Sequence, residues 1–148
     1  MVREPFRFRV EALREAWRDR REASQLSARH DYAAQQQLLR LLHGWVTASL
    51  SDVREVYGPS LAATIEPDSG EVAAAEGAFT VAIGQGVATF SLRQQRREGA
   101  PAWRVASTVT VAGQPLPATS GARARRWTRA KADEILLTLL AAYERSLP

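Results

Sequence analysis

The spacing of apolar residues changes from helical to alternating near Pro59. Between residues 11 and 49 there is no proline, and Ala, Leu, Arg, Glu and Gln, all good helix formers, dominate. Apolar residues there form a short stripe at Val10, Leu13 and Trp17, and then a dense group between residues 38 and 50. We therefore predict that residues 1–59 are mainly helical, with a stop at Tyr57-Gly58-Pro59.

The path of this helical region has two interpretations. The stretch from residue 18 to residue 37 is mostly polar, and Ser24, Ser27 and Asp31 are suitable caps for a second helix. A helical hairpin therefore competes with one long helix that projects past the domain. Before this region, Phe6, Phe8 and Val10 alternate with arginines, a pattern that favours a short edge strand but equally fits the entry to the first helix.

After Pro59 the apolar period becomes two, and turn residues recur at regular intervals. The pattern predicts four antiparallel strands within residues 60–112, joined as a meander. We place them near residues 61–66, 72–83, 87–97 and 103–112, with a bulge at Gly77 in the second.

Alternation assigns one face of this sheet to the core. The predicted core-facing residues are Phe79, Val81, Ile83, Phe90, Leu92, Trp103, Val105, Val109 and Val111. The opposite face carries small and polar residues, namely Thr80, Ala82, Thr89, Ser91, Arg104, Ala106, Thr108 and Thr110.

The C-terminal third begins with a Gly-, Pro- and Ser-containing loop over residues 113–121. Residues 122–148 then show an apolar stripe at helical spacing, so we predict an amphipathic helix packed on the sheet. Residues 1–148 are accordingly expected to form a single α+β domain with a four-stranded antiparallel sheet.

The charge distribution adds a basic C-terminal end to this picture. The net charge is +4, and from residue 99 onward there are seven basic and three acidic residues. The chain has no cysteine, which excludes disulfides and thiolate chemistry, and no apolar run long enough for a signal peptide or a membrane span. We expect a cytoplasmic protein with no membrane partner.

The segment from residue 121 to residue 131 contains five basic residues and no acid at the predicted start of the last helix. A helix N-terminus already carries partial positive charge, so these cations favour an anionic partner there. The predicted nucleic-acid-binding residues are Arg123, Arg125, Arg126, Arg129 and Lys131, extended by Arg93, Arg96 and Arg97 on the neighbouring hairpin. Trp127, within the basic segment, fits a docking side chain better than a base-stacking one.

Other candidate chemistry is weaker. The aromatic residues fall on the predicted core face, which argues against bases stacking on the sheet. His30 and His43 fall on different faces of a continuous helix, and the acids near residues 66–76 fit a solvated turn. No nucleophile, phosphate-loop or metal motif occurs, so we predict no cofactor and no catalytic residue.

These patterns lead to a ranked set of functions. The first is a non-enzymatic module that contacts the DNA or RNA backbone through the arginines, as a homodimer joined by the helical region. The alternative is an interaction or adaptor module that binds an acidic protein. The third is a small-ligand or enzymatic domain with a pocket lined by Arg104, Tyr143 and His43.

Overall fold

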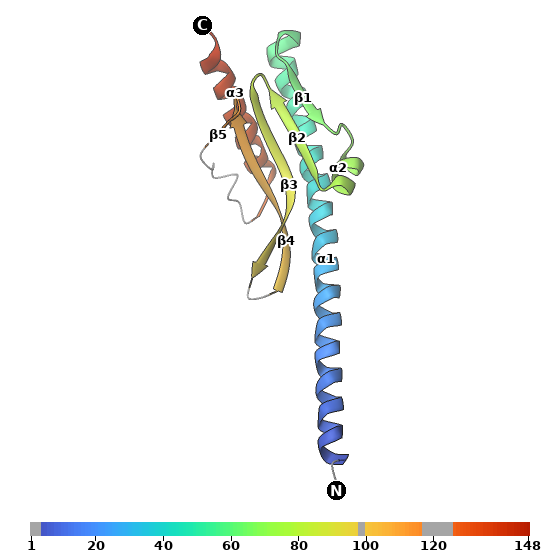
Figure 1. The fold of residues 1–148 in the computed structure, drawn as a ribbon. Coiled ribbons are helices and arrows are strands. Elements are labelled where there is room, and N and C mark those ends of the chain that lie inside the picture. Colours follow the sequence, from blue (N-terminus) through green and yellow to red (C-terminus); the bar gives the residue numbers. More distant parts are fainter. Residues whose placement is uncertain (1–3, 98–99, 117–125) are drawn as a thin grey trace.

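The computed structural model describes residues 4–97, 100–116 and 126–148, and it confirms the predicted α+β class. A long N-terminal helix and a C-terminal helix pack on an antiparallel sheet (Figure 1). The elements, in chain order, are α1 Glu4–Tyr57, the 3-10 turn η1 Gly58–Ser60, β1 Ala63–Glu66, α2 Gly70–Glu76, β2 Ala78–Ile83, β3 Gly86–Arg97, β4 Ala100–Val111, β5 Gln114–Pro115 and α3 Arg129–Ser146.

The helical region is one helix of 54 residues, and the hairpin alternative is wrong. Ser24 and Ser27 lie inside α1 because no glycine or proline interrupts the good helix formers around them. Residues 6–10 are helix and not an edge strand, because no strand in the described part of the chain lies beside them. The predicted stop is confirmed, since α1 ends at Tyr57 and Gly58 follows with a φ of 75°.

The sheet has five strands in the order β1-β2-β3-β4-β5, all antiparallel, rather than the four predicted. The additional strand is β5, a two-residue element that pairs with Thr110 and Val111. It was missed because its residues, Gln114 and Pro115, follow a turn and show no alternation. A left-handed backbone at both Ala112 (φ 52°) and Gly113 (φ 79°) makes that turn.

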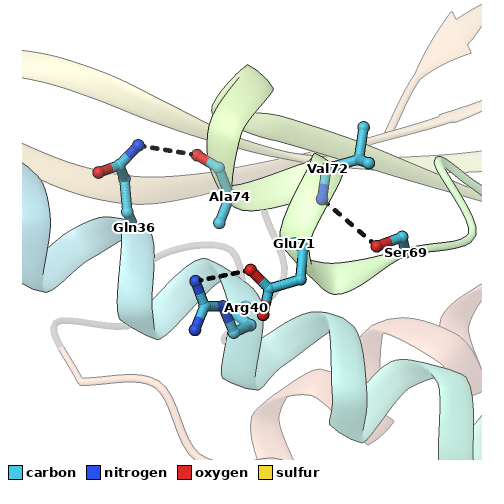
Figure 2. Close-up of polar contacts among 6 residues, drawn as sticks. All are labelled: Gln36, Arg40, Ser69, Glu71, Val72 and Ala74. Atoms are coloured by element: carbon cyan, nitrogen blue, oxygen red, sulfur yellow. Dashed lines mark hydrogen bonds and ion pairs between the residues drawn. The ribbon is translucent and has the colours of Figure 1, made fainter.

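The strand predicted over residues 72–83 is wrong in its first half. The Ser69 side chain accepts a hydrogen bond from the Val72 amide and starts α2, a helix that the alanines at 73–75 favour over a strand. Gly77, predicted as a bulge, has a φ of 76° and ends α2. The α2 helix is held on α1, where Gln36 Nε2 donates to the Ala74 carbonyl at 3.0 Å (Figure 2).

The predicted alternation of the sheet is confirmed, and both long helices contribute to the core against one face. Phe79, Val81, Ile83, Phe90, Val105 and Val109 are buried, whereas Leu92, Trp103 and Val111 are half-buried. The α1 contribution comes from Leu39, Leu42, Val46 and Leu50, and the α3 contribution from Ile135, Leu136 and Leu139. The opposite face stays half-buried or exposed, as predicted.

The C-terminal helix starts later than the predicted residue 122. The Thr128 side chain accepts a hydrogen bond from the Lys131 amide at 3.3 Å and caps α3, which begins at Arg129. Only Arg129 and Lys131 of the predicted basic residues therefore lie in the first turn of α3. The helix dipole acts on fewer cations than the sequence pattern indicated.

A tyrosine–carboxylate pair joins the C-terminal ends of α1 and α3 and makes the stability of the fold depend on pH. The Tyr57 hydroxyl donates to Glu144 Oε1 at 2.7 Å, and this hydrogen bond, with burial and the carboxylate charge, raises the pKa of Tyr57 above its ordinary value of 10.0. The stabilisation from this pair is therefore complete at pH values below the pKa of Tyr57 in the unfolded chain. It is lost as pH rises through the raised pKa of Tyr57 in the folded protein.

We expect Glu144→Gln to lower the pKa of Tyr57, because the amide carries no charge to oppose the phenolate. Ultraviolet absorbance titration, with the Tyr57→Phe spectrum subtracted, measures this change. Glu22→Gln, on an exposed part of α1, is the matched control and should leave the titration unchanged. An unchanged titration in Glu144→Gln would contradict the assignment.

Candidate functional site

About half of α1 extends beyond the rest of the molecule (Figure 1). Residues 5–27 are all exposed, and we call this segment the projecting half of α1. It nevertheless carries large apolar side chains, including Phe6, which is 66% exposed, Leu13 at 60% and Trp17 at 53%. Side chains of this kind are usually buried, so the exposure of several of them together distinguishes the projecting half from the rest of α1.

Four of these side chains form a single narrow stripe. Their spacing alternates between four and three residues, which places them within an arc of about 60° on the helix. The four residues are Phe6, Val10, Leu13 and Trp17. We call this stripe the seam. Phe8 and Leu26 are also exposed, but they lie on the opposite side of α1.

The seam lies on the same side of α1 as the sheet. Five turns of an α-helix take about 18 residues, so Leu13 is in line with Asp31 and Trp17 is in line with Gln35. Both Asp31 and Gln35 bond to the β4 backbone. Figure 1 shows that α1 runs nearly straight. The seam therefore lies on the same face of α1 that packs against the sheet, further toward the N-terminus.

Charged residues of the projecting half are sorted by sign around the helix. Arg7, Arg14 and Arg21 recur every seven residues along one flank of the seam. Arg9 and Arg20 lie on the other flank. The acids occupy the opposite face, and they are Glu11, Glu15, Asp19 and Glu22.

The flanking arginines make few interactions within the described part of the chain. Arg7 Nε lies 3.3 Å from Glu11 Oε1 in an exposed pair, which is a weak interaction. The Arg20 guanidinium stacks over the Trp17 ring at 5.2 Å. Arg14 and Arg21 make no ion pair with any residue that the structure describes.

Above the seam, α1 covers the open edge of β4. The Asp31 carboxylate accepts a hydrogen bond from the Trp103 amide, and Gln35 Oε1 accepts one from the Val105 amide at 3.2 Å. Trp127 Nε1 donates to the Val105 carbonyl at 3.0 Å. These side chains satisfy the backbone groups that a neighbouring strand would otherwise take, so the edge is protected from pairing with another chain.

A groove of about 490 Å³ lies between this part of α1 and the β4 edge. Arg104 and Arg126 both line it, and Arg104 donates to Gln95 at 3.4 Å. Trp103, also in the lining, packs edge-on against Tyr32 with ring centroids 4.8 Å apart. The groove thus combines two arginines with the Asp31 carboxylate and with amide and aromatic groups, a lining that suits a polar chain.

The predicted nucleic-acid-binding residues do not all come together. Arg123 and Arg125 lie outside the described residues, as do the side chains of Arg96 and Arg97, whose backbones pair with β4. The remaining four occupy different positions. Arg126 lies at the groove, and Arg129 is exposed at the start of α3. Lys131 donates to the Arg126 carbonyl at 2.6 Å, and Arg93 is exposed beside Arg104 on the sheet.

Trp127 and Asp31 show what the sequence interpretation found and what it missed. Trp127 is buried and packs against Phe90, which confirms it as a docking side chain. Asp31, one of three candidate caps for a second helix, bonds instead to a strand distant in sequence. The only indication in the sequence is that Asp31 is a lone acid on the core face of a helix, and the sequence does not show which group it bonds.

The pocket suggested for Arg104, Tyr143 and His43 is wrong, because the structure separates them. Arg104 lies by the groove, whereas the Tyr143 ring contacts Gly84 at the other end of the sheet, about 24 Å along the strands. His43 is 3% exposed, its Nε2 hydrogen-bonds to the Pro67 carbonyl at 2.8 Å, and its ring packs on Phe79. It braces the core.

The described acids of residues 66–76 do not form a metal-binding group. Glu71 pairs with Arg40 of α1 at 3.2 Å and helps to hold α2 in place (Figure 2). Among the described residues, no three His, Asp or Glu side chains are grouped so that they can hold a metal ion.

Two surfaces therefore stand out, the seam with its arginines and the groove above it. In the described part of the chain, no helix combines the length and the apolar character needed to cross a membrane. Comparison of the chain with models of protein families, with curated proteins and with solved structures finds no match.

Proposed function

We propose that this protein is a non-enzymatic interaction module that binds an acidic protein through the projecting half of α1. The observation that carries the proposal is the exposure of the seam, in which Leu13 and Trp17 are more than half exposed and, apart from the Arg20 guanidinium over Trp17, no described residue covers them. A partner that buries these side chains gains about 1.5–3 kcal/mol for each of the larger ones.

The stability of the helix supports this proposal. A helix of this length with no tertiary contact is marginal in water, because most helical stability in proteins comes from packing of an apolar face. The projecting half has such a face but nothing in the described chain packs on it. A bound partner supplies the missing packing, and the flanking arginines favour an acidic one.

A pull-down followed by reconstitution tests the proposal. The full chain, immobilised at low salt, is used to retain a partner from an extract of its own cells, and the purified partner is then titrated calorimetrically. We expect Leu13→Glu combined with Trp17→Glu to weaken binding at least tenfold, because each charge would be buried against apolar groups. Equal binding by wild type and variant would overturn the proposal.

Nucleic-acid binding remains a second candidate because Arg104 and Arg126 line one groove. Binding of this kind rests on phosphate contacts and weakens steeply with salt. Fluorescence anisotropy with labelled DNA and RNA across a salt series tests it, comparing wild type with a variant in which Arg104, Arg126 and Arg129 are Ala. A shallower salt slope in the variant supports the candidate, and no binding at low salt removes it.

Homodimerisation through the helical region also stays a prediction. Sedimentation equilibrium of the full chain measures it directly.

A further inference from the structure

We infer that the partner presents a single amphipathic α-helix, with acidic residues on both sides of its apolar stripe, which lies along the seam. This inference rests on the proposed function and specifies the partner's shape and chemistry. Three features of the projecting half carry it: the width of the seam, the charges beside it and the position of the sheet.

The width of the seam suits one helix. Surface helices that pack on a broad core have an apolar face at least about 100° wide, whereas a two-helix coiled coil uses a narrower stripe at seven-residue spacing. Phe6, Val10, Leu13 and Trp17 keep the narrower pattern. Each of them is placed to fit between side chains of one facing helix.

The charges beside the seam specify an acidic helix. Residues that flank the apolar stripe of a coiled coil form ion pairs across the interface and set the choice of partner. Here the flanks are Arg7, Arg14 and Arg21 on one side and Arg9 on the other, while the acids face away. Glutamates or aspartates at the corresponding positions of a partner would pair with these arginines.

The same charges disfavour a second copy of this chain as the occupant. In a parallel pair, Arg9 of one copy would face Arg14 of the other. In an antiparallel pair, the arginines at 7, 14 and 21 would face one another. Both arrangements place like charges together without an acid between them, which is destabilising.

The position of the sheet disfavours a flat surface. Because the seam shares its side of α1 with Asp31 and Gln35, the β3–β4 hairpin stands out from the helix on that side. An extended anionic surface, such as a lipid bilayer, would meet this hairpin before it reached Leu13. A single helix, about 10 Å across, fits beside α1 below the hairpin.

Synthetic helices provide the test with the full-length protein. The probe is a labelled peptide of three heptads, with leucine at the two positions of each heptad that would face the seam and glutamate at the positions beside them. The glutamates keep the peptide from pairing with itself. A second peptide carries lysine at the flanking positions. Vesicles of equal parts phosphatidylcholine and phosphatidylserine form the third arm, and sedimentation of the protein alone forms the fourth.

We expect the acidic peptide to bind and the basic peptide to bind at least tenfold more weakly. Trp17→Ala should weaken binding of the acidic peptide about tenfold or more, because truncation of an interface tryptophan removes its contact area. Arg14→Glu should reduce the preference for the acidic peptide over the basic one. The controls are Phe8→Ala, which truncates an exposed aromatic side chain away from the seam, and Arg29→Glu, which reverses one charge away from the seam, and both should leave binding unchanged.

Other outcomes would overturn the inference. These are equal binding of both peptides, binding of vesicles but no peptide, self-association lost in Trp17→Ala, and no binding in any arm. If the captured partner depends on the seam but the acidic peptide does not bind, this inference fails and the proposed function stands. If the captured partner ignores the seam, the proposed function fails as well.

Discussion

Phe90→Ala is expected to lower the free energy of unfolding by about 3–5 kcal/mol, the usual cost of emptying a buried phenylalanine site. Phe90 is 0% exposed and stacks on Phe79 with ring centroids 4.7 Å apart. It also contacts Trp127, so the cavity would open where the sheet meets the start of α3. Urea denaturation followed by circular dichroism measures the change.

Phe8→Ala makes the identical chemical change at a site that is 70% exposed. It is expected to alter the free energy of unfolding by no more than about 0.5 kcal/mol. A loss of similar size in both variants would contradict the assignment of Phe90 to the core and Phe8 to a free surface.

Asp31→Ala is expected to lower the free energy of unfolding by about 1.5–3 kcal/mol, the range for a hydrogen bond to a charged group. Its carboxylate is the acceptor for the Trp103 amide on the open edge of β4. Without it that amide is left unpaired, and the edge becomes available to another strand. We therefore also expect a greater tendency to aggregate, measured by light scattering.

Asp19→Ala is the control for this variant, because Asp19 is exposed in the same helix and faces away from the seam. Both substitutions gain the helix propensity of alanine, so their difference isolates the bond to β4. Equal stability of the two variants would show that α1 does not protect the β4 edge.

The sheet pattern is the part of the fold that the sequence predicted most accurately. Alternation placed Phe79, Val81 and Phe90 on the core face, and all three are buried. The prediction succeeded because a strand with one buried face has period two, and a shift of one residue would expose every apolar side chain. It failed at residues 70–76, where the cap at Ser69 and three consecutive alanines outweighed the strand pattern.

The candidate site was harder to predict because it depends on direction as well as on residue type. The sequence drew attention to the arginines of residues 121–131, yet α3 begins only at Arg129 and Lys131 bonds within the chain. The stripe at Val10, Leu13 and Trp17 was visible in the sequence. Its exposure was not, because periodicity reports which residues share a face and not whether that face is covered.

The sequence by itself determined the α+β class, the end of α1 at Gly58 and the two faces of the sheet. These depend on local backbone preferences and on the period of apolar residues, which the chain carries in its order. The tertiary structure alone decided the role of Asp31, a candidate cap, because the β4 amide that it bonds lies far away in the sequence. It also decided that the seam is uncovered, because coverage depends on which segments lie beside the helix in space.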